Sequence, residues 1–582
     1  MNVNSFYGKM KHGVHPRPTP EDSEDSCLSD SDEEYTPDHR GNSSDCTPPC
    51  TNPAAPRGRP AAPPTKKRKN IAWKTVEQQN SAKDTPVWED ALPEADTIRM
   101  PIEYFRDFFD EQLVDNIVEQ SNLYCTQQDP NHALKLDRTS LEQFIGTVVY
   151  MSLFSLPRSR MYWSHACRVQ QVADVMSRDR WEEIKHHLHF CDNTAPKNDD
   201  KLYKIRLIID SLLPKFQALP QNQMLCVDEQ MVPIKGRSSL KQYIPKKPYK
   251  WGYKIFVLCD THGLVHSFDI YTGKIEPVPG KPDIGASGNI VLKLAQVIQE
   301  NVNHLLYFDN RFSSLDLFVA LANQGVPALG TVQQNRLRGC SFSTDSEMKK
   351  KGRGTFEEQQ AEVENVDIRV VKWYDNRAVV VASTFASAQP VSTTQRWDRK
   401  LKKDVSVEYP NIVRLYNRFM GGVDALDALI AYYRIQIRSK KFYLRLFFHF
   451  VDMVIVNGWL LYRRDCESLG VPRKVQQDLL DFRSSIAQAL CMEGKNHVVK
   501  KRGQPSLDID REVEKKKRRG PAKAIPVQEV RTDAVGHWPL TEDKRLRCRI
   551  PHCKGQTVVK CAKCNVHLCF NKNTNCFLTF HI

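Results

Sequence analysis

The segment Tyr416–Arg434, YNRFMGGVDALDALIAYYR, joins a glycine pair to an acidic helix start. After the turn expected at Gly421–Gly422, apolar residues recur at spacings of three and four, which predicts a helix. Asp424 and Asp427 are three residues apart, so both project from one face of its first turn. Carboxylates in a first helical turn are also common as plain caps. The pair therefore indicates a site only if other carboxylates meet it.

Two further aspartates follow short apolar runs. Asp228 ends MLCV, and Asp309 ends LLYF. A carboxylate at the end of a buried strand lies at the sheet edge, where ligands of α/β proteins usually bind. If the two strands are neighbours, these carboxylates lie close together, and Asp424 on a packed helix could complete the set. Aspartates at strand ends are also ordinary features of α/β domains, so a purely structural role stays open.

Carboxylates that converge without basic partners repel one another unless divalent cations neutralise them. Ligation by oxygen alone suits Mg²⁺ or Mn²⁺, and two such ions can clamp the attacking and leaving oxygens of a phosphodiester displacement. The sequence contains no GxxxxGK[ST] phosphate loop, so nucleotide hydrolysis has no support. A metal-dependent nuclease is therefore one of two interpretations that these patterns leave open, beside a structural role for the aspartates.

The composition points to a polyanionic partner. The 582 residues carry a formal net charge of +15, although residues 1–50 hold ten acidic and four basic residues. No apolar run in the first twenty residues resembles a signal peptide, so we expect a reducing compartment for the 17 cysteines. The run KKRK at 66–69 has the form of a nuclear localisation signal and predicts a nuclear protein, although such a run also attracts DNA phosphates.

Changes in composition and periodicity divide the chain into segments of a multidomain α/β protein. The expected segments are 1–92 (disordered, with an acidic serine cluster at 21–34), 93–223 (helical), 224–335 (alternating strands and helices), 336–410 (irregular), 411–433 (acidic helix start), 434–492 (helical), 493–530 (basic linker) and 531–582 (Cys-rich). Between residues 495 and 530, eleven Lys and Arg residues stand against five Asp and Glu residues.

Two helical stretches need a choice between interpretations. The apolar run Phe447–Tyr462 contains His449, Asp452 and Asn457, which favours a buried helix over a membrane span. We therefore expect no membrane partner. In WEEIKHHLHF (181–190), three histidines (186, 187 and 189) lie on a predicted amphipathic helix, and we interpret them as ordinary helix residues and not as metal ligands.

The C-terminal cysteines have the spacing of zinc ligands. The candidate ligands, in the pattern C-x4-C-x7-C-x2-C-x4-C-x6-C-x4-H, are Cys548, Cys553, Cys561, Cys564, Cys569, Cys576 and His581. Seven ligands are one short of two tetrahedral sites, and His537, His552 or His567 could supply the eighth. So small a domain would need its metal to fold.

Three acidic segments carry a family resemblance. VDEQMVPIKGR around Asp228, YFDNRFSSLDLF around Asp309 and YNRFMGGVDALD around Asp424 resemble the signature segments of piggyBac-type transposases and of piggyBac-element-derived proteins. The resemblance extends from about Pro101 to the C-terminus and includes LPRSRMYW and HLHFCDN. It implies a ribonuclease H-like catalytic domain in which these three aspartates bind the metal ions and Asp427 is a fourth required carboxylate.

The resemblance also implies partners and domain roles. The family cuts double-stranded DNA at terminal inverted repeats through a hairpin intermediate and inserts it at TTAA targets. Segments 93–223 and 434–492 would form one dimerisation and DNA-binding domain around a catalytic domain made of 224–335 and 411–433, with 336–410 as an insertion domain. The tail resembles the family's cross-brace zinc module, although its first cysteine pair is spaced by four residues instead of two.

An alternative function remains open from the sequence. Some relatives are domesticated, and a descendant that no longer cuts would act as a sequence-specific DNA-binding or chromatin protein. The intact aspartates indicate that the chain keeps the residues needed for cutting, but they do not show that it still cuts DNA.

Overall fold

The computed structural model describes residues 71–76, 85–195, 199–234, 236, 238–245, 247, 249–399, 401–494 and 525–582. The acidic serine cluster (21–34), the basic run (66–69) and most of the basic linker lie outside these residues, as does nearly all of the N-terminal segment predicted to be disordered.

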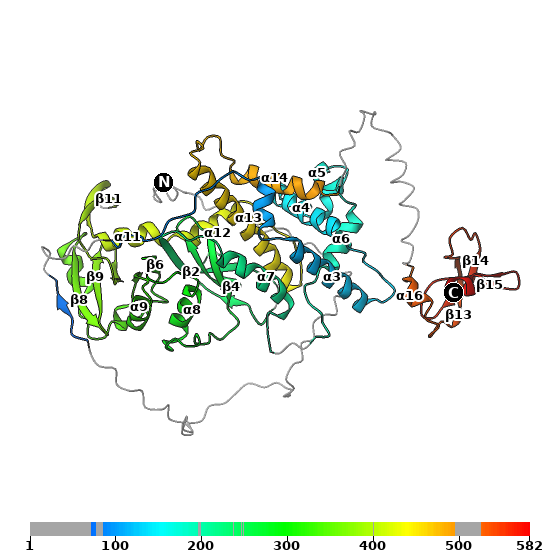
Figure 1. Cartoon of the computed structure of the whole chain (residues 1–582), viewed down its shortest axis with the longest axis horizontal. Coiled ribbons are helices and arrows are strands. Elements are labelled where there is room, and N and C mark those ends of the chain that lie inside the picture. The colour runs from blue at the N-terminus through cyan, green and yellow to red at the C-terminus, as the bar shows by residue number, and fades with distance from the viewer. Residues whose placement is uncertain are drawn as a thin grey trace, which may run out of the picture. The chain divides into compact units, whose positions relative to one another are not determined.

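A mixed sheet forms the centre of the region between the two helical segments (Figure 1). In the described part of the chain its order is β1-β8-β9-β10-β7-β6-β2-β4-β3, and β5 also pairs with β4. The strands are β1 (Lys74–Thr75), β2 (Met224–Pro233), β3 (Gln242–Tyr243), β4 (Trp251–Asp260), β5 (Val265–Ile270), β6 (Leu305–Phe308), β7 (Ala328–Thr331), β8 (Phe356–Val363), β9 (Val366–Tyr374) and β10 (Ala378–Ser383). Strands β2, β6 and β7 are parallel neighbours, whereas the other pairs are antiparallel.

The register between β2 and β6 decides where the acidic residues lie. Val227 pairs with Phe308, so Asp228 and Asp309 occupy the next position on each strand, at the same edge. Only β6 ends there. The expectation that the first strand also stops at Val227 is wrong, because β4 continues to pair with β2 as far as Pro233. Asp228 therefore lies within β2, where β4 still pairs with the strand on one side but β6 has already ended on the other.

Part of the segment predicted as an insertion is continuous with this sheet. Strand β10 pairs with β7, and β9 and β8 add beyond it. A separate hairpin follows, formed by β11 (Ser392–Asp398) and β12 (Lys403–Tyr409). Helices α8 (Ala286–Ala295), α9 (Leu315–Ala322) and α10 (Asp345–Lys351) complete this half of the region.

The helices before and after the sheet pack on one another. The main ones are α2 (Pro101–Arg106), α3 (Glu111–Gln128), α4 (Arg138–Phe154), α6 (Arg178–His187), α7 (Arg206–Gln217), α13 (Phe442–Ser468) and α14 (Leu479–Met492). Helix α14 packs on α4, and α13 packs on α2, although more than 300 residues separate them in sequence (Figure 1). Helices α2 and α3 are separate, because the Asp110 side chain accepts a hydrogen bond from Leu113 N and starts a new helix.

Helix α13 is long and apolar enough to cross a membrane, yet 89% of its apolar window is buried inside the fold. Its polar side chains have partners there. Asp452 forms an ion pair of 2.6 Å with the buried Arg483, and Asn457 exchanges two hydrogen bonds with the backbone of Val265 on β5. The prediction of a buried helix at this position is confirmed.

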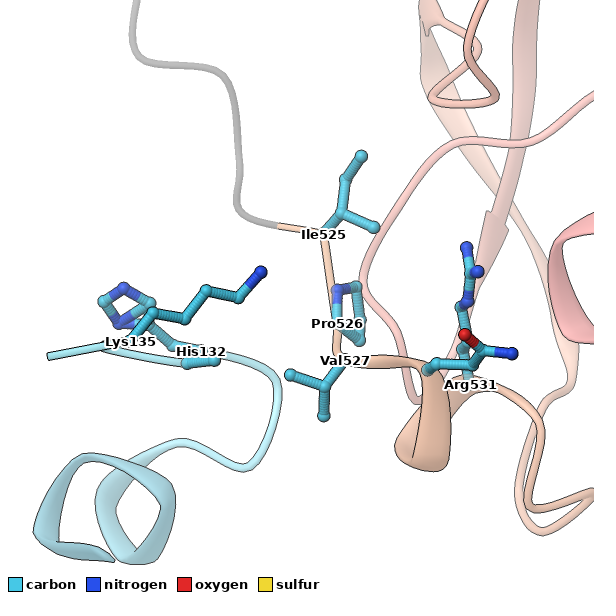
Figure 2. A pocket seen from close by; sticks show the side chains of 8 residues that line it. His132, Lys135, Ile525, Pro526, Val527 and Arg531 are labelled. Carbon is cyan, nitrogen blue, oxygen red and sulfur yellow. The ribbon is translucent and has the colours of Figure 1, made fainter. Parts of the chain in front are cut away.

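The C-terminal tail has a small core of its own, made of cysteines and Val566, Leu568, Phe577 and Phe580. Its elements are α16 (Gln528–Arg531), β13 (Pro539–Arg547), β14 (Gln556–Cys561), β15 (Phe570–Asn571), β16 (Thr574–Asn575) and α17 (Cys576–His581). Figure 2 shows Ile525, Pro526 and Val527 on the chain that leads into α16.

Candidate active site and cysteine clusters

Helix α12 (Gly422–Tyr432) reaches the sheet because its first residue has no side chain. A Cβ on Gly422 would lie 2.1 Å from Asp260 O and 2.6 Å from Cys226 Sγ. The helix start is thus pressed against β2 and β4, above the buried pair Cys226 and Cys259. The preceding Gly421 has open space around it and a φ of −81°. Of the two glycines in the predicted turn, Gly422 is the one that lies close to the sheet.

The residues before this glycine pair are also helical. Helix α11 (Asn411–Phe419) buries Ile412, Val413 and Leu415 against the sheet. The first residues of the segment quoted above, 416–419, are therefore the end of a helix whose apolar face begins upstream of that segment.

Asp228 is half-buried on β2 and receives a hydrogen bond of 2.7 Å from Glu229 N. Burial raises the pKa of Asp228 to about 7, and the nearby carboxylates of Asp309 and Glu229 add to the rise, while Lys247 opposes it. A carboxylate in this setting lacks enough positive charge around it. A bound cation would supply that charge.

Asp309 follows β6 and is also half-buried. Its Oδ1 accepts a hydrogen bond of 2.8 Å from Arg311 N. Burial raises the pKa of Asp309, and Glu229 adds to the rise. The Glu229 carboxylate itself contacts Arg311 and Lys254, so the basic residues at this edge are partly engaged by Glu229.

Asp424 and Asp427 project from the first turns of α12. Asp424 is exposed, whereas Asp427 is half-buried. Burial raises the pKa of Asp427, Asp424 adds to the rise, and a hydrogen bond of 2.8 Å from Gln230 Nε2 opposes it. The two residues share a face as predicted, but only Asp427 is held by a neighbouring strand.

Tyr416 on α11 is affected by the charge of three acidic residues. Burial raises the pKa of the Tyr416 phenol, and Asp309, Asp228 and Asp424 each add to the rise by their negative charge. The Tyr416 hydroxyl accepts a hydrogen bond of 3.4 Å from Thr331 on β7. Asp228 on β2 and Asp309 after β6 therefore lie at one edge of the sheet, where α12 with Asp424 packs on β2.

The aspartate oxygens are spread more widely than the ligands of a single ion. They are not among the groups of ligand atoms that lie within 4.8 Å of one another in the described residues. A site for two ions distributes its carboxylates around cations about 3.5–4 Å apart. All of these potential ligand atoms are oxygens, and few positive charges surround them. Such a set of ligands fits magnesium or manganese.

Sequence reasoning missed two residues behind Asp427. Gln230 lies two residues after Asp228 on β2, and its Oε1 accepts a hydrogen bond of 2.7 Å from His449 Nε2 on α13. Both side chains are buried. Alternation along β2 puts Gln230 on the same face as Asp228, and His449 is a polar residue in an apolar helix. Both features are visible in the sequence, but only the structure shows that the two side chains meet.

The predicted zinc ligands fall into two groups of four. One group contains Cys548, Cys553, Cys569 and Cys576, and the other contains Cys561, Cys564, His581 and His537. The pairs alternate along the chain, as in a cross-brace. Of the three candidates for the eighth ligand, His537 joins a group, whereas His567 Nε2 lies 3.1 Å from Glu542 Oε2 instead.

Distances within both groups suit tetrahedral zinc. Cys553 Sγ lies 3.9 Å from Cys569 Sγ and 3.7 Å from Cys576 Sγ, near the roughly 3.8 Å expected for two thiolates on one zinc ion. Cys564 Sγ lies 3.3 Å from His537 Nδ1 and 3.5 Å from His581 Nε2.

The other nitrogen of each histidine is anchored. His537 Nε2 pairs with Asp533 Oδ1 at 2.9 Å, and His581 Nδ1 pairs with the Phe577 carbonyl at 2.7 Å. Such outer contacts orient histidine ligands of metals. The cysteine-rich tail therefore contains two groups that can bind zinc.

The family model described as Transposase IS4 matches residues 100–459. Human PiggyBac transposable element-derived protein 3 is 30% identical over 489 residues, which cover 83% of this chain and 76% of that protein. Human PiggyBac transposable element-derived protein 2 is 30% identical over 488 residues with the same coverage. The chain belongs to the piggyBac family of transposases and transposable element-derived proteins.

A solved structure shares the fold. The cryo-EM structure of a piggyBac transposase synaptic complex with hairpin DNA has a TM-score of 0.56 to this chain and 19% sequence identity. The similarity covers 82% of this chain and 97% of that one. The mixed α/β architecture is thus that of a piggyBac transposase.

Proposed function

We propose that this protein is a DNA transposase, or a descendant that keeps its chemistry, which cuts and joins phosphodiesters with divalent metal ions. The observation that carries the proposal is the placement of Asp228 and Asp309 at one edge of the sheet, where α12 with Asp424 packs on β2. The three aspartates come from β2, β6 and α12, elements that are far apart in sequence. Buried carboxylates with raised pKa values, as at Asp228 and Asp309, are typical of functional sites.

The fold proposed for this site is ribonuclease H-like. Its support is the strand order β5-β4-β2-β6-β7, in which three antiparallel strands are followed by two parallel ones. Asp228 lies on β2, Asp309 directly follows the neighbouring β6, and Asp424 lies on the helix packed against β2. We assign residues 224–335 and 411–433 to this catalytic domain.

The residues divide the work between metal binding and support. Magnesium ions held by Asp228, Asp309 and Asp424 would activate the attacking oxygen and stabilise the leaving oxygen of the phosphodiester. Asp427, held by Gln230, adds negative charge beside Asp424 and fixes the angle of the helix. Lys247 and Arg311 provide positive charge at the same edge for the DNA backbone.

Double-stranded DNA is the proposed partner. A formal net charge of +15 favours it, and a solved relative is a complex with hairpin DNA. We extend the family's properties to this chain: recognition of terminal inverted repeats by the zinc tail (531–582), TTAA targets, a homodimer built on the helical segments (93–223 and 434–492), an insertion domain (336–410) and nuclear localisation.

A strand-transfer assay tests the proposal. The protein is incubated with magnesium and a pre-nicked repeat end flanked by TTAA, and hairpin formation is measured on a denaturing gel. We expect hairpins from the wild type and none from Asp309→Asn. Asp404→Asn, at an exposed position of the β11–β12 hairpin, is the matched control and should be fully active.

The same assay distinguishes the transposase from the alternative function. Repeat binding by wild type and Asp309→Asn alike, with no hairpin from either, would overturn the enzyme and favour a domesticated DNA-binding or chromatin protein. Hairpins of equal yield from both proteins would overturn the assigned site.

A further inference from the structure

Three potential metal ligands meet in the first helical segment, away from the acidic site and the tail. Cys125 lies near the end of α3, His132 lies on the loop that follows it (Figure 2), and His187 is the last residue of α6. One ligand atom of each lies within 4.8 Å of the other two. Cys125 is buried, whereas both histidines are partly exposed.

Both histidine rings are anchored through one nitrogen by the same residue. His132 Nε2 pairs with Glu183 Oε1 at 2.9 Å, and His187 Nδ1 donates to the Glu183 carbonyl at 3.0 Å. Because His187 Nδ1 carries the proton, its Nε2 keeps a free lone pair. A carboxylate and a backbone carbonyl are the usual outer partners of metal-bound histidines.

The remaining nitrogen of His132 faces the thiol. His132 Nδ1 lies 3.8 Å from Cys125 Sγ. A tetrahedral zinc ion with bonds of about 2.3 Å to sulfur and about 2.0 Å to nitrogen would separate these atoms by about 3.5 Å. The gap therefore matches two ligands of one ion to within a few tenths of an ångström.

The tail repeats this arrangement. There, His537 is anchored by the Asp533 carboxylate and His581 by the Phe577 carbonyl, and each turns its other nitrogen toward Cys564 Sγ. In the helical segment the Glu183 carboxylate and carbonyl take these two outer roles. The similarity lies in the pattern of anchored rings around a thiol.

We propose that Cys125, His132 and His187 bind a divalent transition-metal ion of the zinc class, with a fourth position open to water. The ion ties the loop between α3 and α4 to α3 and α6. This assignment corrects the interpretation of the histidine-rich helix for His187 alone. His189 is bonded to Tyr443 at 2.8 Å and lies outside the group, as does His186.

The chemistry supports a transition metal over magnesium or calcium, because a thiolate and two imidazoles are soft or borderline ligands. The ordinary alternative is a thiol that donates to the His132 carbonyl, 3.4 Å away. That contact explains why a cysteine fits here. It does not explain why two anchored histidines turn toward it.

Metal content of the full-length protein tests the proposal. Wild type, His132→Gln, His187→Gln and His186→Gln are purified in the presence of zinc and dialysed, and bound zinc is measured by mass spectrometry alongside helical content. We expect each of the first two variants to hold about one equivalent less zinc per chain than wild type. His186→Gln, the neighbour on the same helix, should match wild type.

Equal zinc in all four proteins would overturn the site. So would a loss in His187→Gln that His186→Gln shares, since this would indicate damage to the helix. If His187→Gln fails to fold, His132→Gln decides, because His132 lies on a loop and is partly exposed. Unchanged zinc in folded His132→Gln then rejects the proposal.

Discussion

Gln230 Nε2 donates a hydrogen bond of 2.8 Å to Asp427 Oδ1. The amide thereby links strand β2, which carries Asp228, to helix α12, which carries Asp424. On its other side, Gln230 Oε1 accepts from His449 Nε2 of α13 at 2.7 Å. One side chain from the sheet thus holds two helices in place behind the acidic site.

Gln230→Leu should reduce both stability and hairpin formation. The change leaves the buried His449 ring and the Asp427 carboxylate without a partner, and each unsatisfied group costs about 1–3 kcal/mol. Chemical denaturation measures the free energy of unfolding. The double variant Gln230→Leu/His449→Leu removes both members of one hydrogen bond and should recover part of the loss. A double variant as unstable as the sum of the two single variants would contradict the coupling.

Gly422→Ala should be far more damaging than Gly421→Ala. The new methyl group would lie 2.1 Å from Asp260 O, so α12 must move away from the sheet and carry Asp424 with it. We expect a loss of about 1–3 kcal/mol in stability and no hairpin product. Gly421 has no neighbour within 4 Å of the added Cβ and an ordinary φ, so its variant serves as the matched control. Similar Tm values for both variants would refute this packing argument.

Asp228→Asn should stabilise the protein at pH 8 when no magnesium is added. Burial raises the pKa of Asp228 to about 7, above its unfolded value of about 3.9, so the folded state binds more protons between these values. Stability therefore falls as pH rises through this window, by roughly 1–3 kcal/mol for a half-buried group.

The asparagine variant removes this pH dependence. Thermal unfolding at pH 4 and pH 8 measures the difference: the two proteins should be alike at pH 4 and diverge at pH 8. Magnesium should then raise the Tm of wild type more than that of Asp228→Asn. A wild-type Tm that magnesium leaves unchanged would argue against metal binding by this carboxylate.

His537→Ala should remove about one equivalent of zinc from the tail. His537 Nδ1 lies 3.3 Å from Cys564 Sγ, so its loss leaves three ligands in that group. His552→Ala is the control, because His552 belongs to neither group. Zinc per chain, measured by mass spectrometry on full-length protein, checks the assignment. Equal zinc loss from both variants would leave the eighth ligand unassigned.

The sequence by itself determined the kind of elements and the kinds of ligand. Periodicity identified α4, the buried helix α13 and the strands that carry Asp228 and Asp309, because apolar spacing is a local property of the chain. Spacing of cysteines identified the tail as a zinc candidate. It could not choose among His537, His552 and His567, since all three lie at plausible distances along the chain.

Only the tertiary structure decided which distant residues meet. Parallel pairing of β2 and β6 put Asp228 beside Asp309, and the close approach at Gly422 packed the helix that carries Asp424 against β2. The partnership of Gln230 and His449 spans 219 residues, and Cys125 meets His187 across two helices. Such contacts depend on strand register and on which helix faces pack together, and these are properties of the whole fold.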